Sequence, residues 1–554
     1  MKPSFLKLLT LSLLALTLSC GPGLQPISFS TVDEINYQTG KKQPLNETVL
    51  KSWLLKDLRT DSLPGMSVEK AYTEIIKSKK GTTTIVAVID SGVDIEHEDL
   101  KDLIWTNLDE VPNNGIDDDN NGYVDDIHGW NFLGDVVMEN LEFVRYLKAL
   151  TPRFEGKSPQ DISANDKADF ELYQKVKAEY DTEYRKTVNN RLRYKGLKEQ
   201  VALAHQAISE KLGKTTYTKQ DLDAITNPSS LEQNYIGLLS QMFAYAPTIP
   251  KLIDDISDGI THFQNKLDGQ LNLETNFRAT LGDNPNDISD VGYGNSQVSG
   301  PDPKKADARH GTHVAGIIAA NRNNTIGLKG VANNVQLMVL RAVPDGDEYD
   351  KDIALAIRYA VDNGAKVINT SFGKYYSPHP NWVKEAILYA ASKDVLIVNA
   401  AGNEAYNLDE KIVFPNDQEK TMAEISNNFL TVGAINYPLS ENLLADFSNY
   451  GATNVDVFAP GVKIWSTVPL NNYEYLQGTS MAAPAVSGVA AVIRSLYPNL
   501  SAAQVKEIIM ASGVLLPYKV NLGGDASTQK PLSAISQTGK IVNLYNALLL
   551  AKQY

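Results

Sequence analysis

The sequence predicts an α/β fold built on a mostly parallel central sheet, and two features of the chain indicate it. Short unbroken runs of apolar, largely β-branched residues recur along the chain, which is typical of strands buried on both faces of a parallel sheet. Segments with the apolar spacing of helices lie between these runs. With 554 residues, 43% of them apolar, the chain is long enough to bury a large core.

The individual elements follow from these patterns. A helix is predicted over residues 67–77, where apolar residues recur at steps of three and four. The predicted buried strands are 85–89, 335–340, 367–369 and 395–399, and the predicted helices between the later strands are 351–363 and 381–393. Functional groups in such sheets gather at the carboxyl ends of the strands, so residues just beyond these runs are candidates for a site.

Residues 136–282 depart from this alternation. They are polar and charged, and their apolar residues recur at mostly three or four positions, as in amphipathic helices. One helix over 167–212 would be about 70 Å long, so we expect a break near Gly196 or a hairpin. We interpret 136–282 as an α-helical insertion into an α/β domain formed by 53–135 and 283–554.

The first twenty residues predict export from the cytoplasm. Lys2 and Lys7 flank the start of an apolar run over 8–18, which has the charge and length of a signal peptide. The run has about half of the roughly 20 residues that a membrane-spanning helix needs, so a permanent transmembrane anchor is the weaker alternative. The net charge of −14 argues against nucleic acid or an anionic membrane held by a basic surface.

The position of Cys20, the only cysteine, adds a second expectation. A small residue and a cysteine directly after the apolar run resemble a bacterial lipobox, in which the cysteine becomes the lipidated N-terminus. Thr17 and Leu18 depart from the usual pattern, and an ordinary signal peptide cleaved nearby is the alternative. Residues 21–52 are then expected to form a tether, giving an extracytoplasmic lipoprotein at the cell envelope.

Three short segments place a reactive side chain among glycines and small residues. Asp90 ends the predicted strand 85–89, His310 opens a predicted helix, and Ser480 starts another helix after Gly478. Small residues let a substrate approach the backbone closely, and a helix N-terminus offers N–H groups to a developing anion. Taken singly these signals are weak, since an aspartate at a strand end often only caps a turn.

A zinc site on the second segment is the alternative to weigh. His310 and His313 lie three residues apart on one helical face, a spacing that metal pairs use. However, the segment lacks the glutamate of the H-E-x-x-H pattern. We therefore expect His313 to be a packed helix residue.

In the order Asp90, His310, Ser480, the three segments resemble the subtilisin-like serine peptidases (peptidase S8 family). The resemblance covers about 67–135 and 283–515. It implies a subtilisin-like three-layer sandwich around the sheet and a catalytic triad made of these three residues.

Two further segments carry the resemblance beyond the triad. Asn403, in Ala-Ala-Gly-Asn-Glu, resembles the family's oxyanion-hole asparagine. The segment Ser371, Phe372 and Gly373 resembles the one that lines the S1 pocket and pairs with substrate backbone. These matches imply substrate-binding roles for all three residues and a transition-state role for Asn403.

The activity that the resemblance implies is hydrolysis of protein or peptide substrates by a serine endopeptidase. His310 would take the proton of Ser480, and Asp90 would orient the imidazole. The alternatives are a non-catalytic envelope binding protein on a peptidase scaffold, and an esterase or lipase. An esterase or lipase needs the G-x-S-x-G elbow, and residues 478–482 lack the second glycine of that motif.

A calcium site is predicted in residues 113–126, which place oxygen-bearing side chains at alternate positions before a glycine turn. The expected ligands are the side chains of Asp117, Asp119, Asn121 and Asp125 and the carbonyl of Tyr123. The loop lacks the glutamate that closes an EF-hand, and a solvated acidic turn is the alternative. The family resemblance adds Asp99 as a further calcium ligand.

Overall fold

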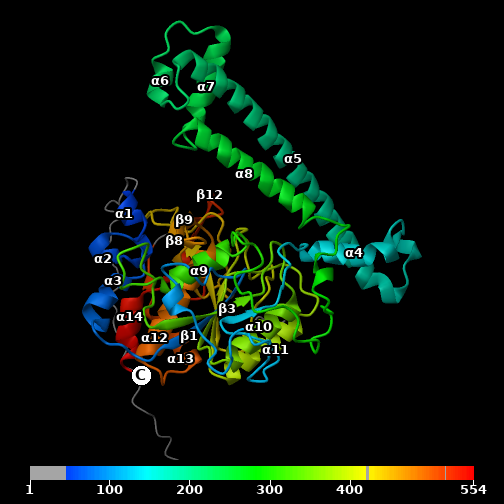
Figure 1. The fold of residues 1–554 in the computed structure, drawn as a ribbon, viewed down its shortest axis with the longest axis vertical. Coiled ribbons are helices and arrows are strands. Elements are labelled where there is room, and N and C mark those ends of the chain that lie inside the picture. The colour runs from blue at the N-terminus through cyan, green and yellow to red at the C-terminus, as the bar shows by residue number, and fades with distance from the viewer. Residues whose placement is uncertain (1–44, 419–422, 518) are drawn as a thin grey trace, which may run out of the picture.

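The computed structural model describes residues 45–418, 423–517 and 519–554. The expected signal peptide, Cys20 and the tether up to residue 44 lie outside the described residues. Figure 1 shows a rounded body from which a helical arm projects.

The body is built on one nine-stranded sheet, with the order β10-β13-β7-β6-β5-β4-β1-β3-β2. Every neighbouring pair is parallel except β10 and β13, so the predicted fold class is confirmed. The strands are β1 Thr84–Asp90, β2 Gly129–Asn131, β3 Val335–Arg341, β4 Val367–Thr370, β5 Leu396–Ala400, β6 Phe429–Ile435, β7 Val457–Pro460, β10 Val514–Leu515 and β13 Lys540–Ile541. Two antiparallel hairpins stand apart from it: β8 Ile464–Val468 with β9 Asn472–Leu476, and β11 Lys519–Leu522 with β12 Asp525–Pro531.

Helices cover both faces of the sheet. Successive residues of a strand point to opposite faces, and in β1 Val86 and Val88 belong to one hydrophobic cluster while Ala87 and Ile89 belong to another. The helices of the first cluster are α9 Arg309–Ala319, α12 Thr479–Leu496, α13 Ala502–Ser512 and α14 Leu544–Ala551, and those of the second are α10 Asp350–Asp362 and α11 Pro380–Ser392. The body therefore has three layers.

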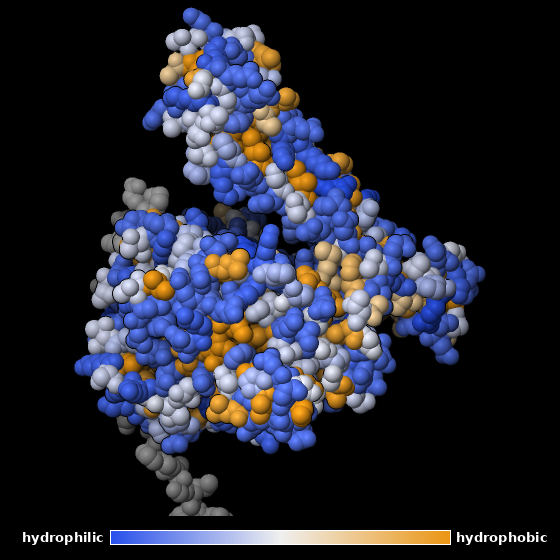
Figure 2. All heavy atoms as spheres, viewed as in Figure 1, coloured by the Kyte–Doolittle hydropathy of each residue, from blue (hydrophilic) through white to orange (hydrophobic). Residues whose placement is uncertain are grey.

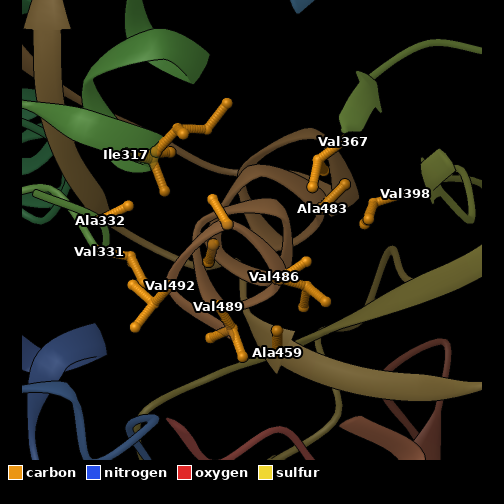
Figure 3. Packing of buried hydrophobic residues seen from close by; sticks show 14 of the residues in the cluster. Ile317, Val331, Ala332, Val367, Val398, Ala459, Ala483, Val486, Val489 and Val492 are labelled. Carbon is orange, nitrogen blue, oxygen red and sulfur yellow. The ribbon is translucent and has the colours of Figure 1, made fainter. Parts of the chain in front are cut away.

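Helix α12 is the central helix of the larger cluster. Its small and β-branched side chains pack against Ile317 of α9, Val331 and three strands, β4, β5 and β7 (Figure 3). By length and composition alone α12 could cross a membrane, but 89% of it is buried inside the protein, as expected of a core helix.

The N-terminal part of the body consists of short helices. They are α1 Glu47–Leu50, a 3-10 turn Trp53–Leu55, α2 Leu58–Asp61, α3 Val68–Ala71 and a π-helical turn Tyr72–Ile76. Val49 and Leu50 pack against the core, so residues 45–52 belong to the folded body rather than to the expected tether. The side chains of Val49 and Leu50 bury apolar surface against the core. The polar residues around them in the sequence gave no indication of this burial.

The arm leaves the body after β2 and returns before α9. Its helices are α4 Glu142–Phe154, α5 Lys167–Leu212, α6 Lys219–Asp223, α7 Ser230–Met242 and α8 Ile249–Asp268. Short 3-10 turns lie between β2 and α9 at Pro159–Asp161, Ala164–Asp166 and Phe277–Thr280, and in the rest of the body at Lys101–Leu103 and Leu532–Ala534. Figure 1 shows α5 and α8 side by side, with α6 and α7 at the tip.

The expected break near Gly196 was wrong, because α5 is one continuous helix of 46 residues. A glycine inside a helix costs only about 1 kcal/mol relative to alanine. Packing on both halves offsets that cost: Val176 lies in a cluster with α4, and Val201 lies in a cluster with α7 and α8. The helix ends at Gly213, whose φ of 63° is the left-handed conformation that glycine adopts readily.

The surface of the arm is mixed in character. Figure 2 shows orange, hydrophobic residues scattered among blue, hydrophilic ones along it. The large apolar side chains exposed on α5, on α7 and between α7 and α8 are Tyr184, Leu192, Leu203, Leu231 and Tyr245.

Candidate active site

Asp90 and His310 form a hydrogen-bonded pair at the carboxyl end of β1. His310 Nδ1 lies 2.8 Å from Asp90 Oδ1, and the same oxygen accepts a 2.7 Å bond from the backbone N–H of Ser91. The start of α9 can approach the strand this closely because residue 311 is glycine. A Cβ there would lie 2.1 Å from the carbonyl oxygen of Gly92.

The pair has an asymmetric environment that affects the pKa of His310. The Asp90 side chain is 2% exposed, and that of His310 is 40% exposed. Burial lowers the pKa of His310, but the charge and hydrogen bond of Asp90 outweigh burial and raise the pKa above its ordinary value. The Asp90 carboxylate thus favours the protonated imidazole.

Ser480 is the second residue of α12. The turn before it contains Gly478, whose φ of 149° suits glycine. Ser480 Oγ donates to the carbonyl oxygen of Ser371 at 3.1 Å, and Ser371 Oγ donates to the carbonyl oxygen of Ser480 at 3.0 Å. These reciprocal bonds hold the segment after β4 against the start of α12.

Asn403 is fixed to the same turn. Its Oδ1 accepts bonds from the N–H of Thr479 at 2.8 Å and from Thr479 Oγ1 at 3.1 Å, and Gly402 N donates to Thr479 Oγ1 at 3.0 Å. With its oxygen bonded to the start of α12, the Asn403 amide has its NH₂ group available to another acceptor.

A pocket of about 210 Å³ connects these segments. Phe372 and Gly373 form part of its wall, together with Ser480 and Asn403. The remaining lining residues are Val343, Gly346, Glu348, Tyr375, Ala400, Gly402, Glu404, Val413 and Thr479. Helices α9 and α12, which carry His310 and Ser480 at their N-terminal ends, pack against each other. Strand ends and helix starts thus bring together segments far apart in the sequence.

His313 is a packed helix residue, as expected. It is fully buried, and its Nε2 lies 3.1 Å from the carbonyl oxygen of Ile464 and 3.2 Å from that of Glu474. Burial lowers the pKa of His313 to about 3, so the ring stays neutral. Nε2 of the ring is thus engaged by two backbone carbonyl groups inside the packed body.

The acidic loop brings three carboxylates together. Ligand atoms of Glu110, Asp119 and Asp126 all lie within 4.8 Å of one another. Asn121 Nδ2 donates to Asp119 at 3.0 Å and to Asp126 at 2.9 Å. Burial raises the pKa of Asp126, hydrogen bonds partly offset this, and Asp119 raises it further. Oxygen donors at this spacing suit a hard cation such as Ca²⁺, which would relieve the repulsion between them.

The other expected ligands lie outside this group of carboxylates. Asp117 accepts bonds from the N–H groups of Asn121 and Gly122, and Asp125 accepts bonds from those of Asn114 and Gly115. These two aspartates therefore shape the loop.

Tyr123 and Asp99 are also engaged by neighbouring residues. The ring of Tyr123 packs against Trp130, and Asp99 accepts bonds from Tyr473 Oη and Leu328 N. Sequence reasoning missed Glu110 because it precedes the loop, and missed Asp126 although it ends the same acidic run.

Comparison with known proteins finds one family model and several proteases that this chain resembles. The model of the Subtilase family matches residues 81–530. The chain is 44% identical over 192 residues to "Thermophilic serine proteinase" of Bacillus sp. (strain AK1), covering 34% of this chain and 43% of that protein. It is 38% identical over 233 residues to "Subtilisin DY" of Bacillus licheniformis, covering 42% and 79%. A solved structure of a protease from Pseudoalteromonas arctica matches with a TM-score of 0.35 and 28% identity, covering 44% and 70%. The chain thus spans less than half of the first of these relatives.

Proposed function

The chain belongs to the subtilase family, and from this premise we propose that it is a serine endopeptidase whose nucleophile is Ser480. Its substrates are proteins or peptides, and hydrolysis passes through an acyl-enzyme on the Ser480 oxygen. The observation that carries the proposal is the 2.8 Å contact between His310 and Asp90. The pocket that Ser480 and Asn403 share supports it.

The contact between Asp90 and His310 supports the role of His310 as general base. If Nδ1–H donates to Asp90, the lone pair of the neutral ring lies on Nε2, the nitrogen that would receive the proton of Ser480. Asp90 stabilises the imidazolium that results and stays ionised. In the second half of the reaction His310 returns a proton to the leaving amine.

Asn403 would stabilise the negative charge that grows on the carbonyl oxygen of the substrate. Its amide oxygen is engaged by Thr479, which supports an NH₂ group directed at the pocket. The N–H of Ser480, at the start of α12, is the second donor. Fixed donors of this kind favour the transition state over the bound substrate.

Covalent labelling tests the nucleophile directly. A serine-directed fluorophosphonate probe is expected to label the purified protein at Ser480 and to leave Ser480→Ala unlabelled. The control variant Ser527→Ala, in the exposed hairpin of β11 and β12, should label like the parent. Absence of label in protein shown to be folded by circular dichroism would instead favour the non-catalytic binding protein.

A structural calcium ion is part of the proposal. Glu110, Asp119 and Asp126 would hold it, with Asn121 beside them, because these three acids are close together and two of them, Glu110 and Asp126, are buried. The ion would supply positive charge that neutralises the acidic cluster and so stabilise the loop. We assign it no step in the hydrolysis.

We also propose export and lipid attachment at Cys20, on sequence grounds alone. Metabolic incorporation of labelled palmitate into the parent chain, and its loss in Cys20→Ser, are the expected results. Incorporation that persists in Cys20→Ser would exclude this anchor.

A further inference from the structure

Arg341 is a buried arginine at the end of β3, beside Asp90. The two residues are partners in the parallel register of β3 and β1, and Arg341 is 1% exposed. A guanidinium stays charged in proteins, so its burial is costly unless its N–H groups are bonded. Arg341 belongs to none of the sequence motifs around Asp90, His310 and Ser480.

The guanidinium of Arg341 has one acceptor for each of its five N–H donors. The acceptors are the carbonyl oxygens of Ser91 (from Nε, 3.2 Å), Gly134 (from Nη1, 3.0 Å) and Val136 (from Nη2, 2.8 Å), with Asn131 Oδ1 (from Nη1, 3.0 Å) and Asp307 Oδ2 (from Nη2, 3.2 Å). One planar group thus joins the ends of β1 and β2 to the loop before α9.

The bond to Ser91 acts on the orientation of the Asp90 carboxylate. The N–H of Ser91 donates to Asp90 Oδ1 at 2.7 Å, and this is the oxygen that contacts His310 Nδ1. Ser91 Oγ accepts a bond from the N–H of Gly311 at 3.4 Å. A shift of Ser91 would therefore displace Asp90 and the start of α9 relative to each other. Arg341 Nε opposes such a shift by holding the carbonyl oxygen of Ser91.

The bond to Asp307 acts on the helix that carries His310. Asp307 lies three residues before His310, just ahead of α9, and its side chain is 5% exposed. The space around the ion pair is filled, because a Cβ at Gly300 would lie 2.1 Å from Asp307 Oδ2 and 3.0 Å from Arg341 Nε. The guanidinium therefore connects the end of β1 and the start of α9 within close-packed surroundings.

We propose that Arg341 is a positioning residue of the catalytic pair, whose guanidinium fixes Asp90 and His310 in the orientation in which the imidazole contacts the carboxylate. The inference rests on the proposed peptidase function and gives Arg341 no contact with substrate. A displacement of about 1 Å in a reacting group can cost about 100-fold in rate, so the geometry of the five bonds matters as well as the charge.

The first variant is Arg341→Lys. Lysine keeps the positive charge, but its three donors lie on one atom, so it cannot reach the five acceptors together. We expect kcat for peptide hydrolysis to fall by about 10- to 1000-fold, which is less than for Asp90→Asn. KM should change by less than about threefold, because the loss concerns the general base rather than substrate binding.

Arg494→Lys is the matched control. Arg494 is 4% exposed and donates to Asp394 Oδ2 at 2.7 Å and to the carbonyl oxygen of Leu500, so it is also a buried and paired guanidinium. It lies near the C-terminal end of α12, whereas Ser480 lies at the start of that helix. Both variants should lower the midpoint of urea unfolding, but Arg494→Lys should change kcat by less than about twofold.

A second measurement follows the pKa of His310, which a purely structural arginine would not affect. The rate of fluorophosphonate labelling at Ser480 is measured against pH, and its midpoint reports the ionisation of the general base. Because Asp90 raises the pKa of His310, a loosened contact should lower this midpoint by at least about 0.5 in Arg341→Lys. The charge of Arg309, which also acts on the ring, is the same in both variants.

The outcomes separate the inference from the proposed function. If Arg341→Lys does not fold, Asp307→Asn replaces it; the uncharged acceptor weakens the bond to Nη2, and kcat should fall by at least about threefold. The inference is overturned if kcat in the folded variant matches that of Arg494→Lys, or if kcat falls in Arg341→Lys without a shift of the labelling midpoint. A parent protein that cleaves no peptide would instead count against the proposed function.

Discussion

The base of the arm is joined to the body through a buried group of charges, and this gives a prediction that can be worked through numerically. Glu142, at the start of α4, receives bonds from Lys374 Nζ at 2.8 Å and Arg145 Nη2 at 2.5 Å. The side chains of Glu142 and Lys374 are 5% and 2% exposed. Removing the charge in Glu142→Gln leaves two buried cations with a weaker partner.

The pKa of Glu142 gives the magnitude. Burial raises it, but Arg145 and Lys374 outweigh burial and lower it from 4.5 to about 2, which corresponds to about 3 kcal/mol. Burial lowers the pKa of Lys374, but Glu142 and then Asp350 outweigh burial and raise it from 10.5 to about 12, or about 2 kcal/mol. The two shifts share the pair of Glu142 and Lys374, so they are not added. Glu142→Gln should therefore lower the free energy of unfolding by about 2 to 3 kcal/mol at pH 7.

The pH dependence has a defined sign. Because the folded pKa lies below the unfolded one, the contribution is complete above about pH 4.5 and is lost as pH falls towards 2. The assay is urea unfolding of parent and variant at pH 7 and pH 3, both with Ser480→Ala to prevent autolysis. The difference between them should shrink by about half at pH 3.

A matched control separates burial from charge. Glu171→Gln removes an equal charge from α5, where Glu171 and Lys167 form a pair whose side chains are 65% and 76% exposed. This variant should lose less than about 0.5 kcal/mol. A loss below about 1 kcal/mol in Glu142→Gln, or a loss that is equal at both pH values, would refute the reasoning.

Four further predictions concern the active site and the acidic loop. Asn403→Ala should still be labelled by the fluorophosphonate but lose about 10² to 10³ in kcat, a magnitude known from subtilisin; near-normal turnover would remove Asn403 from the site. The acid limb of kcat/KM should reflect His310, whose pKa is raised, so activity should rise with pH through a midpoint above about 6.5. In Asp90→Asn burial and the charge of Arg309, which both lower the pKa of His310, remain, so this midpoint should move lower while kcat drops by about 10⁴; an unmoved midpoint would contradict the pairing. Calcium chelation should lower the Tm of the Ser480→Ala protein, and Asp126→Asn should abolish that response, whereas an equal response in both would dismiss Asp126 as a ligand.

The fold could be predicted where a local pattern reports the environment of a whole element. The run over 85–89 is apolar without interruption because β1 is covered on both faces, and Asp90 directly after it lies at the strand end as expected. The continuity of α5 could not be predicted, because Gly196 is tolerated only through packing by other helices. That packing comes from α4 on one half of α5 and from α7 and α8 on the other, which the residues around Gly196 do not report.

The residues of the candidate sites also differ in whether the sequence reveals them. Asp90, His310 and Ser480 each stand in a distinctive short segment, so the sequence reveals them one at a time. Glu110 has no such surroundings. It becomes a candidate only when folding brings it to the acidic loop, and spacing along the chain does not report that proximity.

The arm and the pocket share structural parts. Lys374 directly follows Gly373 of the pocket wall, and it pairs with Glu142 of α4 while donating to the carbonyl of Glu348. The N–H of Glu142 also donates to Asp347, next to Glu348. Since buried charges tolerate little displacement before their pairing is lost, the base of the arm holds two walls of the pocket in place.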